Sequence, residues 1–506
     1  MSFWEMVEHY NTIANDFIWG VFGVALLLIA GLLMTIFTKC FQVTHFRHWI
    51  RNTVLSIKNK PGAKKAKKEG EISQFQALCT ALAATIGTGN IAGVATAIMS
   101  GGAGAIFWMW FAAFFGMATK FSEISLGIYF RRRNKDGAWS GGAMYYLSDG
   151  LGQKKGMKVF SRVLAGAFAL FAMIASLGTG NLSQVNSIVK NLESAFLENA
   201  PQYEILGLPA MPLFIGLVLF LASAVVIFGG LKRLAAVSEK IVPLMALLYV
   251  GGSVLIIAVN FSRIGAMFAC IFRSAFNIHA VEGGVVGLLT KVVVSGCRRG
   301  IFSNEAGLGS AVMVHSSARV KDPARQGMWG IFEVFSVTFI ICTMTALTIL
   351  SSGYVNLTTG FVETAGLEGA TLTALSFGSV FGSFGQIFVA VSLCLFAFTT
   401  ILGWSEYGAK ATEYLFGNTA GKVYKVIFVF MIIPAAVMTS DLAWGIADTF
   451  NGLMMIPNLI GLVALAPLVA KITKNYVDRI IHGKKGIQPM YSYDPALQKE
   501  MEETEL

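Results

Sequence analysis

Uncharged, apolar stretches long enough to cross a lipid bilayer recur along the whole 506-residue chain, and they constrain its fold more than any other feature. A bilayer core about 30 Å thick needs roughly 20 consecutive apolar residues in a helix. Hydrophobic residues make up 55% of the chain and charged residues only 13%, whereas soluble domains carry about 25% charge. Backbone polar groups inside a bilayer must be paired internally, so these stretches predict an all-α polytopic membrane protein.

We expect eleven transmembrane helices, which comprise one leading span and ten core spans numbered in chain order. Their ranges are 17–38, 76–100, 104–130, 160–190, 212–230, 240–260, 283–312, 326–352, 381–405, 423–439 and 443–469. Residues 261–281 are amphipathic and too short for a span, and they contain Arg263 and Arg273, so they predict an interfacial helix.

Basic residues lie on alternate loops of this arrangement. They fall in 39–75, 131–158, 232–240, 319–325, 410–425 and the tail after 470. The opposite loops are acidic or neutral, and the positive-inside rule then places the N-terminus outside and the C-terminus in the cytoplasm. The same distribution accounts for the net charge of +11, so no nucleic-acid partner is expected.

Core span one contains a string of poor helix formers at its centre, A-A-T-I-G-T-G-N, residues 83–90. Each glycine there costs roughly 1 kcal/mol relative to alanine. The string begins to break the span about 16 Å from the start, which is close to the bilayer midplane. Unwound backbone at this depth must line a cavity or be buried in protein, so the span is expected to be broken at a polar site.

Core span six shows a second anomaly, since Gly296 and Gly300 bracket Arg298 and Arg299. We expect a break between these glycines, with the arginines facing protein or water. The two anomalies are five spans apart in chain order, which is an odd number, so the two broken spans run in opposite directions. This arrangement is typical of a five-plus-five inverted repeat with its binding site at the repeat interface. The alternative is that the glycines only allow close helix packing.

Each break exposes the ends of half-helices. Free carbonyls are expected near residues 83–86 and 295–299, and free N–H groups near residues 88–90. Helix C-termini favour cations and helix N-termini favour anions. A small zwitterion such as an amino acid, together with Na⁺, fits this arrangement.

Polar side chains on two further spans lie at the same depth. Gln184 in core span three can hold an amino or carboxyl group, or simply bond a neighbouring helix. Thr399 and Thr400 in core span eight offer hydroxyls to a hard cation, or bond their own helix carbonyls. Trp404 lies one turn below Thr400 and either closes a pocket or anchors at the interface.

Other titratable residues give no sign of an enzyme. Lys120 and Glu123 are three residues apart in core span two and are expected to pair with each other, with a proton relay as the alternative. The six histidines fall outside or at the edges of the spans, and the six cysteines form no CxxC pair, so neither a disulfide nor a metal site beyond Na⁺ is expected. Catalytic motifs such as HExxH, GxSxG and the P-loop are missing. An uncoupled channel is less favoured than a transporter because paired broken spans are typical of transporters.

The strings C-T-A-L-A-A-T-I-G-T-G-N-I-A-G-V-A-T-A and G-C-R-R-G-I-F-S-N-E-A-G-L-G-S-A resemble those of the alanine or glycine:cation symporter family, the prokaryotic sodium:alanine symporters. The resemblance implies a LeuT-type fold of ten core helices plus one leading helix. It implies symport of alanine or glycine, and in some members D-alanine, with Na⁺ as coupling ion and no other cofactor. It also implies a cell (inner) membrane location and a functional monomer. H⁺-coupled symport is the alternative, because Glu123, Glu305 and Glu333 are titratable.

The same resemblance assigns roles to individual residues. The backbone that receives the substrate carboxylate belongs to Gly87, Thr88 and Gly89. The side chains that line the pocket are Asn90, Gln184, Phe302 and Trp404. The groups that hold Na⁺ are the carbonyls of Ala83 and Ile86 and the hydroxyls of Thr399 and Thr400.

The chain accordingly divides into six regions. They are the leading helix 1–40, the basic cytoplasmic loop 41–75, the first five-helix repeat 76–260, the outer interfacial helix 261–282, the second repeat 283–470 and the cytoplasmic tail 471–506. The tail is expected to be mobile from about Gly483.

Overall fold

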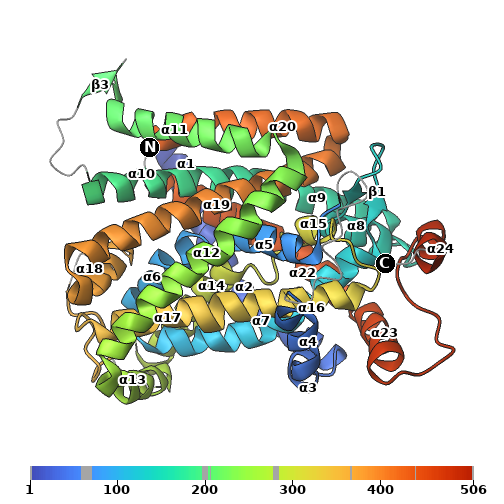
Figure 1. Cartoon of the computed structure of the whole chain (residues 1–506), viewed down its shortest axis with the longest axis horizontal. Coiled ribbons are helices and arrows are strands. Elements are labelled where there is room, and N and C mark those ends of the chain that lie inside the picture. The colour runs from blue at the N-terminus through green and yellow to red at the C-terminus, as the bar shows by residue number, and fades with distance from the viewer. Residues whose placement is uncertain are drawn as a thin grey trace.

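Long helices lie side by side along one axis in the computed structural model of the chain, and α12 crosses them diagonally (Figure 1). The structure describes residues 3–57, 71–196, 203–205, 207–276, 284–364, 367, 369–438 and 440–503. Much of the basic loop 41–75 and the end of the predicted interfacial helix therefore lie outside the described residues.

Helices account for nearly all of the secondary structure. Those of the first half are α1 (Phe3–Trp19), α2 (Val21–Phe37), α3 (Phe41–Thr44), α4 (Phe46–Asn52), α5 (Gln74–Thr85), α6 (Ala92–Gly101), α7 (Gly104–Tyr129), α8 (Ala143–Tyr145), α9 (Lys158–Leu177), α10 (Ser183–Phe196), α11 (Ala210–Ile227), α12 (Gly230–Val259) and α13 (Ile264–Phe276). Those of the second half are α14 (Gly284–Asn304), α15 (Val312–His315), α16 (Pro323–Val334), α17 (Thr343–Ser351), α18 (Gly369–Phe381), α19 (Ser383–Phe416), α20 (Asn418–Phe430), α21 (Ile432–Val437), α22 (Ser440–Ala464), α23 (Ala466–Tyr476) and α24 (Pro495–Glu503).

Shorter elements complete the chain. The 3₁₀ helices are η1 (Val54–Ser56), η2 (Thr88–Asn90) and η5 (Phe261–Arg263), and the π-helices are η3 (Tyr146–Leu151), η4 (Gly178–Leu182), η6 (Phe335–Cys342) and η7 (Val477–Ile481). Two small antiparallel hairpins pair β1 (Arg132–Arg133) with β2 (Trp139–Ser140) and β3 (Glu204–Ile205) with β4 (Leu208–Pro209).

Eight helices among the described residues are long and apolar enough to cross a bilayer. A ninth span results if α22 and α23, which are bent by 62° at their junction, are counted as one. These helices support a polytopic membrane protein. The two pieces α5 and α6 are each too short to cross alone, and α14 carries Lys291 and two arginines, so the total of eleven stays a prediction.

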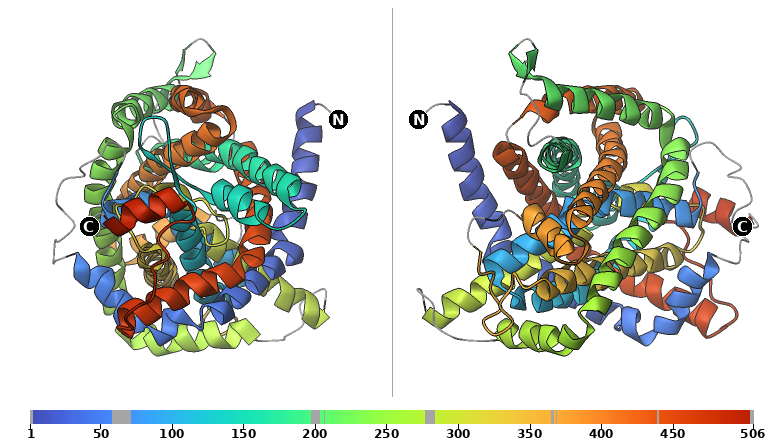
Figure 2. Two further views of the ribbon diagram at one scale, coloured as in Figure 1. Left: turned by 90° about the vertical axis from the view of Figure 1, so that its right-hand side faces the viewer. Right: turned by 60° about the vertical axis from the view of Figure 1, so that its left-hand side comes forward.

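The predicted basic and acidic segments separate to the two ends of the bundle. Figure 1 shows α3, α4, β1, α8, α23 and α24 in the right-hand half, and α13, α18 and β3 at the left-hand end. Figure 2 shows the bundle from its right-hand end, with α1 on its outer side. The surface between the ends exposes large apolar side chains such as Phe214, Val225 and Leu247, which is typical of a lipid-facing surface.

The predicted break in core span one is confirmed. Helix α5 starts at a capping box, in which Gln76 N donates to Ser73 Oγ and Ser73 N donates to Gln76 Oε1, both at 3.0 Å. It ends at Thr85 because Ile86 is extended, with ψ 94°. The single turn η2 follows, and α6 resumes the span at Ala92. Core span one therefore consists of two half-helices joined by residues 86–91.

The break predicted between Gly296 and Gly300 is wrong, because α14 is continuous from Gly284 to Asn304. The helix ends instead at Asn304, because the next residue, Glu305, has a φ of +55°, and an irregular segment leads to α15. The packing alternative holds for both glycines. A Cβ on Gly296 would lie 2.2 Å from the carbonyl oxygen of Ala105 in α7, and a Cβ on Gly300 would lie 3.2 Å from a backbone atom of the same helix. These glycines let α14 and α7 approach closely.

The tail is folded through residue 503, so the expectation of mobility from Gly483 is corrected for these residues. Leu497 and Met501 of α24 are buried against Trp139. The backbone N–H of Tyr493 donates to the carbonyl of Tyr129 at 2.9 Å. The tail thus packs on the segment that follows α7.

Substituting Gly296 by alanine tests the close packing of α14 on α7. We expect the free energy of unfolding to fall by about 1–3 kcal/mol, because the added methyl group overlaps a backbone oxygen. Thermal unfolding of the purified protein in detergent, followed by tryptophan fluorescence, measures this loss. The matched control is Gly166→Ala in α9, where no atom lies within 4 Å of the added Cβ, so stability should stay equal or rise. Equal melting temperatures for the two variants would contradict the packing assignment.

Candidate functional site

The joint between α5 and α6 has an unusual pattern of backbone hydrogen bonds. The N–H of Gly87 donates to the side-chain oxygen of Asn90 at 2.9 Å, and the N–H of Asn90 donates back to the carbonyl of Gly87 at 3.2 Å. Because Gly87 is committed to Asn90, it does not bond the carbonyl of Ala83, four residues earlier. Asn90 therefore caps the turn, and the carbonyl of Ala83 is left at the open end of α5.

Several buried polar groups at this joint have no hydrogen-bond partner among the residues that the structure describes. They are the backbone N–H groups of Thr88 and Gly89, the hydroxyl Oγ1 of Thr88 and the amide oxygen Oε1 of Gln184. A buried polar group without a partner costs about 1–3 kcal/mol. Such a cluster indicates a site that is completed by a polar ligand.

Two other helices bring their side chains to Gly87. A Cβ on Gly87 would lie 2.8 Å from Thr400 Oγ1 in α19 and 3.4 Å from Gln184 Oε1 in α10. The amide nitrogen of Gln184 donates to the carbonyl of Thr179 in η4 at 3.1 Å, which fixes the direction of its oxygen. The structure therefore joins three of the residues chosen from the sequence, and it requires a glycine at position 87.

The two threonines of α19 differ in their surroundings. Thr400 Oγ1 contacts the carbonyl oxygen of Ile86 at 3.3 Å and its own helix carbonyl at Phe396 at 3.0 Å. Thr399 Oγ1 donates to the same Phe396 carbonyl at 3.0 Å and lies 3.6 Å from Met245 Sδ. The structure thus joins Thr400 to the end of α5. It gives Thr399 no hydrogen bond to that end among the described residues.

Helix α19 reaches the joint by packing closely on α5. A Cβ on Gly403 would lie 2.6 Å from the Cβ of Ala84. This contact fixes the depth of Thr400, which lies nearly one turn earlier in the same helix.

Two aromatic residues complete the predicted set. Phe302 of α14 lies against the joint, since a Cβ on Gly89 would be 3.1 Å from Phe302 Cδ1. Trp404 is fully buried and packs on Gly180 of η4, where an added Cβ would lie 2.1 Å from Trp404 Cβ. Phe302 thus contacts the turn directly, whereas Trp404 contacts the element that precedes Gln184.

Core span seven supplies residues that were not predicted from the sequence. Thr345 Oγ1 donates to the carbonyl of Asn90 at 2.9 Å. Cys342 Sγ lies 3.5 Å from both Asn90 Nδ2 and Ser303 Oγ, and so links η2 to α14. The π-helix η6 ends at Cys342, and π-helical turns often occur at functional sites. The T-x-T pattern at 343–345 within an apolar span was the available signal.

The predicted pairing of Lys120 with Glu123 is wrong. Lys120 Nζ instead contacts Glu333 Oε1 of α16 at 3.1 Å and donates to the carbonyl of Asn304 at 3.0 Å. Glu333 Oε1 also accepts from Thr85 Oγ1 at 3.0 Å. The ion pair therefore joins the end of α5 to the end of α14, and both charged side chains are fully buried.

His315 ends the short helix α15 between core spans six and seven, and it is buried beside this pair. Its Nε2 lies 3.3 Å from Glu333 Oε2, and its Nδ1 lies 2.8 Å from Gln326 Nε2. A separate contact satisfies Glu123, whose Oε1 accepts from Asn458 Nδ2 of α22 at 2.5 Å. Helices from both halves of the chain thus share one buried polar network.

Arg298 of core span six lies beside polar groups, as expected. Arg298 Nη2 donates to Asp448 Oδ2 of α22 and to Asn15 Oδ1 of α1, both at 2.6 Å. One guanidinium group therefore ties α14 to α1 and to α22.

Comparisons with known proteins agree with one another. The sequence profile of the sodium:alanine symporter family matches residues 4–490. The sodium/alanine symporter AgcS of Methanococcus maripaludis is 40% identical over 472 residues, which cover 93% of this chain and 97% of that protein. The probable sodium/glutamine symporter GlnT of Bacillus subtilis is 36% identical over 494 residues, which cover 97% of this chain and 94% of that protein.

A solved structure shows a similar fold. The crystal structure of MhsT in complex with L-phenylalanine aligns with a TM-score of 0.50 at 14% sequence identity, and the alignment covers 80% of this chain and 99% of that chain. The likeness shows a LeuT-like fold for the chain.

A double-mutant cycle on Lys120 and Glu333 tests the ion pair. Either Lys120→Met or Glu333→Met leaves a buried charge without its partner and should cost about 3–5 kcal/mol of stability. The double variant should be more stable than the sum of the single losses by about 1–3 kcal/mol. Thermal unfolding in detergent measures all three variants, with Lys291→Met on the exposed side of α14 as control. Strictly additive losses would show that the two side chains do not interact.

Proposed function

The chain belongs to the sodium:alanine symporter family and is a Na⁺-coupled amino-acid symporter, and we propose that it imports alanine or glycine, or both, by alternating access. The observation that carries this proposal is the set of polar groups at Thr88 and Gly89 that have no partner among the described residues, beside Gln184 and Thr400 from two other helices. D-Alanine fits the same chemistry, because the residues that we assign recognise the carboxylate and the amino group of the substrate, and both enantiomers carry these groups.

We place the substrate carboxylate at the N–H groups of Thr88 and Gly89. Both groups lie at the start of a turn that leads into α6, where partial positive charge favours an anion. Gly87 and Asn90 shape this turn through their mutual hydrogen bonds. Gln184 Oε1 faces the turn as an acceptor for the substrate ammonium group.

We place the aromatic residues around the side chain of the substrate. The ring of Phe302 would lie 3.1 Å from a Cβ on Gly89, so it limits the space beside the turn. Trp404 closes the site behind Gly180. These contacts favour a small side chain, and a longer side chain would have to displace an aromatic ring.

We place Na⁺ at the open end of α5. The carbonyl oxygens of Ala83 and Ile86 and the hydroxyl of Thr400 are hard oxygen donors at a helix C-terminus, which favours a cation. Thr399 belongs to the same proposed site, and its hydroxyl would have to turn from the Phe396 carbonyl to reach the ion. Binding of Na⁺ at the end of α5 requires no enzymatic or redox group.

Binding and conformational change can be coupled through the joint. Na⁺ would bind the Ile86 carbonyl at one end of the turn, and the substrate would bind the N–H groups at the other end. Each ligand would therefore order the binding site of the other. The proposal requires a five-plus-five inverted repeat, in which each repeat contains one broken span. Helices α1 and α2 form the leading helix that precedes it. The breaks at 86–91 and 305–311 supply its two flexible points. Release of the Arg298 contact to α1 and α22 would accompany opening.

The proposed orientation follows from the charges. The end of the bundle that holds α3, α4, α23 and α24 would face the cytoplasm of a prokaryotic cell, and the N-terminus would lie outside. The site is complete within one chain, which agrees with a functional monomer.

H⁺-coupled symport is a second candidate, because the buried Glu333 and His315 reach the joint through Thr85. Uptake driven by a pH gradient in Na⁺-free proteoliposomes would select it. An uncoupled channel is less favoured, and it would equilibrate the substrate without accumulating it.

Substituting Thr400 by alanine tests the cation site. We expect the Na⁺ concentration for half-maximal uptake to rise on the order of tenfold, which corresponds to ~1.4 kcal/mol, because one oxygen donor is lost. Uptake of labelled alanine into proteoliposomes at varied Na⁺ measures this change. Thr400→Ser keeps the hydroxyl and should restore the wild-type value, and Thr399→Ala should have the smaller effect. An unchanged Na⁺ dependence in Thr400→Ala would move the ion elsewhere.

Substituting Gln184 by leucine tests the substrate site. The loss of its amide oxygen should weaken alanine binding about tenfold and affect the Na⁺ dependence less, because the oxygen faces Gly87 and the amino-acid site. Competition by unlabelled alanine at saturating Na⁺ gives the substrate affinity. Asn191→Leu in the same helix is the matched control, since the Asn191 amide bonds its own helix at Ser187 and no other residue that the structure describes. Equal losses for substrate and Na⁺ would favour a purely structural role for Gln184.

A further inference from the structure

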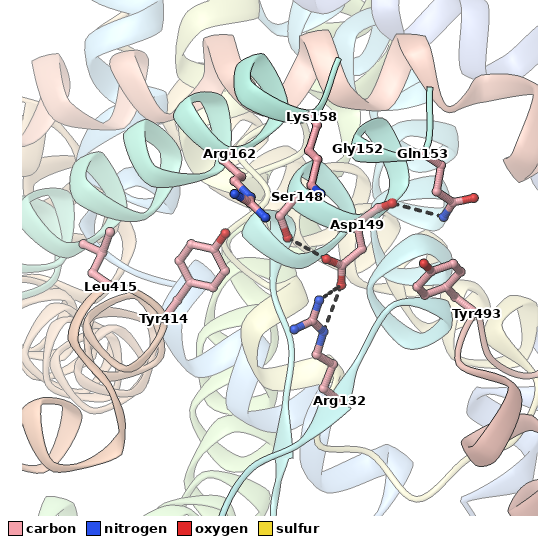
Figure 3. A pocket seen from close by; sticks show the side chains of 10 residues that line it. All are labelled: Arg132, Ser148, Asp149, Gly152, Gln153, Lys158, Arg162, Tyr414, Leu415 and Tyr493. Atoms are coloured by element: carbon pink, nitrogen blue, oxygen red, sulfur yellow. Dashed lines mark hydrogen bonds and ion pairs between the residues drawn. The ribbon is translucent and has the colours of Figure 1, made fainter. Parts of the chain in front are cut away.

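A second hollow lies far from the joint, at the end of the bundle that collects the basic segments. It is an open pocket of about 580 Å³ between β1, η3, the first turns of α9, the end of α19 and the C-terminal segment. Figure 3 shows its side chains, of which the polar ones that matter here are Arg132, Asp149, Lys158, Arg162, Tyr414 and Tyr493. The symport mechanism uses none of these residues.

The pocket carries an excess of positive charge. Arg132 is paired with Asp149, whose carboxylate also accepts from Ser148 Oγ at 3.0 Å. The charged groups of Lys158 and Arg162 face the same space and form no hydrogen bond or ion pair with any described residue (Figure 3). Both residues lie in the first turns of α9, where the helix dipole already adds partial positive charge. This placement is unfavourable for the helix itself, so it indicates an anionic ligand.

The rim of the pocket is apolar and faces outward. Val159 and Val163 directly follow the two basic residues on α9 and are 75% and 65% exposed. Phe416 follows the pocket residue Leu415 at the end of α19 and is 68% exposed. Both helices are long apolar spans, and the pocket lies where α9 begins and α19 ends. Cationic side chains beside exposed apolar ones at the end of a span match a lipid headgroup with its acyl chains.

We propose that this pocket binds the phosphate headgroup of an anionic phospholipid from the leaflet at the basic end of the bundle. Lys158 and Arg162 hold the phosphate, and the hydroxyls of Tyr414 and Tyr493 can donate to the headgroup. The acyl chains lie along the exposed valines of α9. A soluble phosphate would use the same cations but would leave the apolar rim without a role.

The position of the pocket connects a bound lipid to the transport site. Tyr414 is on α19, the helix that carries Thr400, and Tyr493 is held to α7 by the hydrogen bond from its N–H to Tyr129. A headgroup between them would tie the end of α19 to the segment that follows α7 and to the tail. We therefore expect the lipid to stabilise the folded protein whether or not Na⁺ and an amino acid are present.

Thermal unfolding of the full chain in detergent tests the proposal. Phosphatidylglycerol should raise the melting temperature more than phosphatidylcholine or an equal concentration of inorganic phosphate. The variant K158Q/R162Q should weaken the apparent affinity for phosphatidylglycerol on the order of tenfold. Its matched control K155Q/K232Q removes two exposed lysines from the same end of the bundle, outside the pocket, and should keep the wild-type response. Neither pair of substitutions should alter the melting temperature measured without lipid by more than a small amount.

Two results would overturn the proposal. One is equal stabilisation of wild type and K158Q/R162Q by phosphatidylglycerol. The other is full stabilisation by inorganic phosphate alone, which would identify a site for a soluble anion. The measurement needs neither Na⁺ nor substrate, so its failure is distinct from a failure of the uptake experiments.

Discussion

The buried ion pair between Lys120 and Glu333 is the interaction on which the rest of the site depends. Its ammonium group binds the last carbonyl of α14 at Asn304, and its carboxylate accepts from Thr85 at the end of α5. A broken helix leaves backbone groups that neither lipid nor its own turns can satisfy. The ammonium group supplies a partner to a backbone carbonyl at the end of α14, and the carboxylate holds the end of α5 through the Thr85 hydroxyl. Removing two charges from water costs several kcal/mol each, and the cost is offset here because each charge has several partners.

The contrast between this network and the joint beside it defines the binding site. Glu333 has three partners within 3.3 Å, whereas Thr88 Oγ1 and Gln184 Oε1 are buried with none among the described residues. A rigid frame next to unsatisfied groups is a preorganised site, since ligand binding does not have to order the frame. The close approach of α19 at Gly403 and of α14 at Gly89 keeps those groups in reach of one another.

The first break could be predicted from the sequence and the second could not, for a physical reason. Thr85, Gly87 and Asn90 are all weak helix formers at bilayer depth, and three such residues together strongly favour a break. Glycine alone does not distinguish a break from close packing, and Gly296 and Gly300 turned out to be packing residues against α7. The pairing of Lys120 was mispredicted because a spacing of three residues shows only that two side chains share a helix face. Glu333 lies far along the chain in α16, but the fold brings its carboxylate to 3.1 Å from the Lys120 ammonium group.

The amino-acid sequence by itself determined that the chain is a membrane protein, where its first span is broken, and which oxygen-bearing residues are found at that depth. These properties are local, because helix propensity and burial in lipid act on consecutive residues. Only the tertiary structure decided that Thr400 rather than Thr399 contacts Ile86, that Asn90 caps Gly87, and that Lys120 joins the two helix ends. Those choices depend on helix rotation and on contacts between distant segments, and a shift of one residue, which turns a helix by about 100°, reverses them.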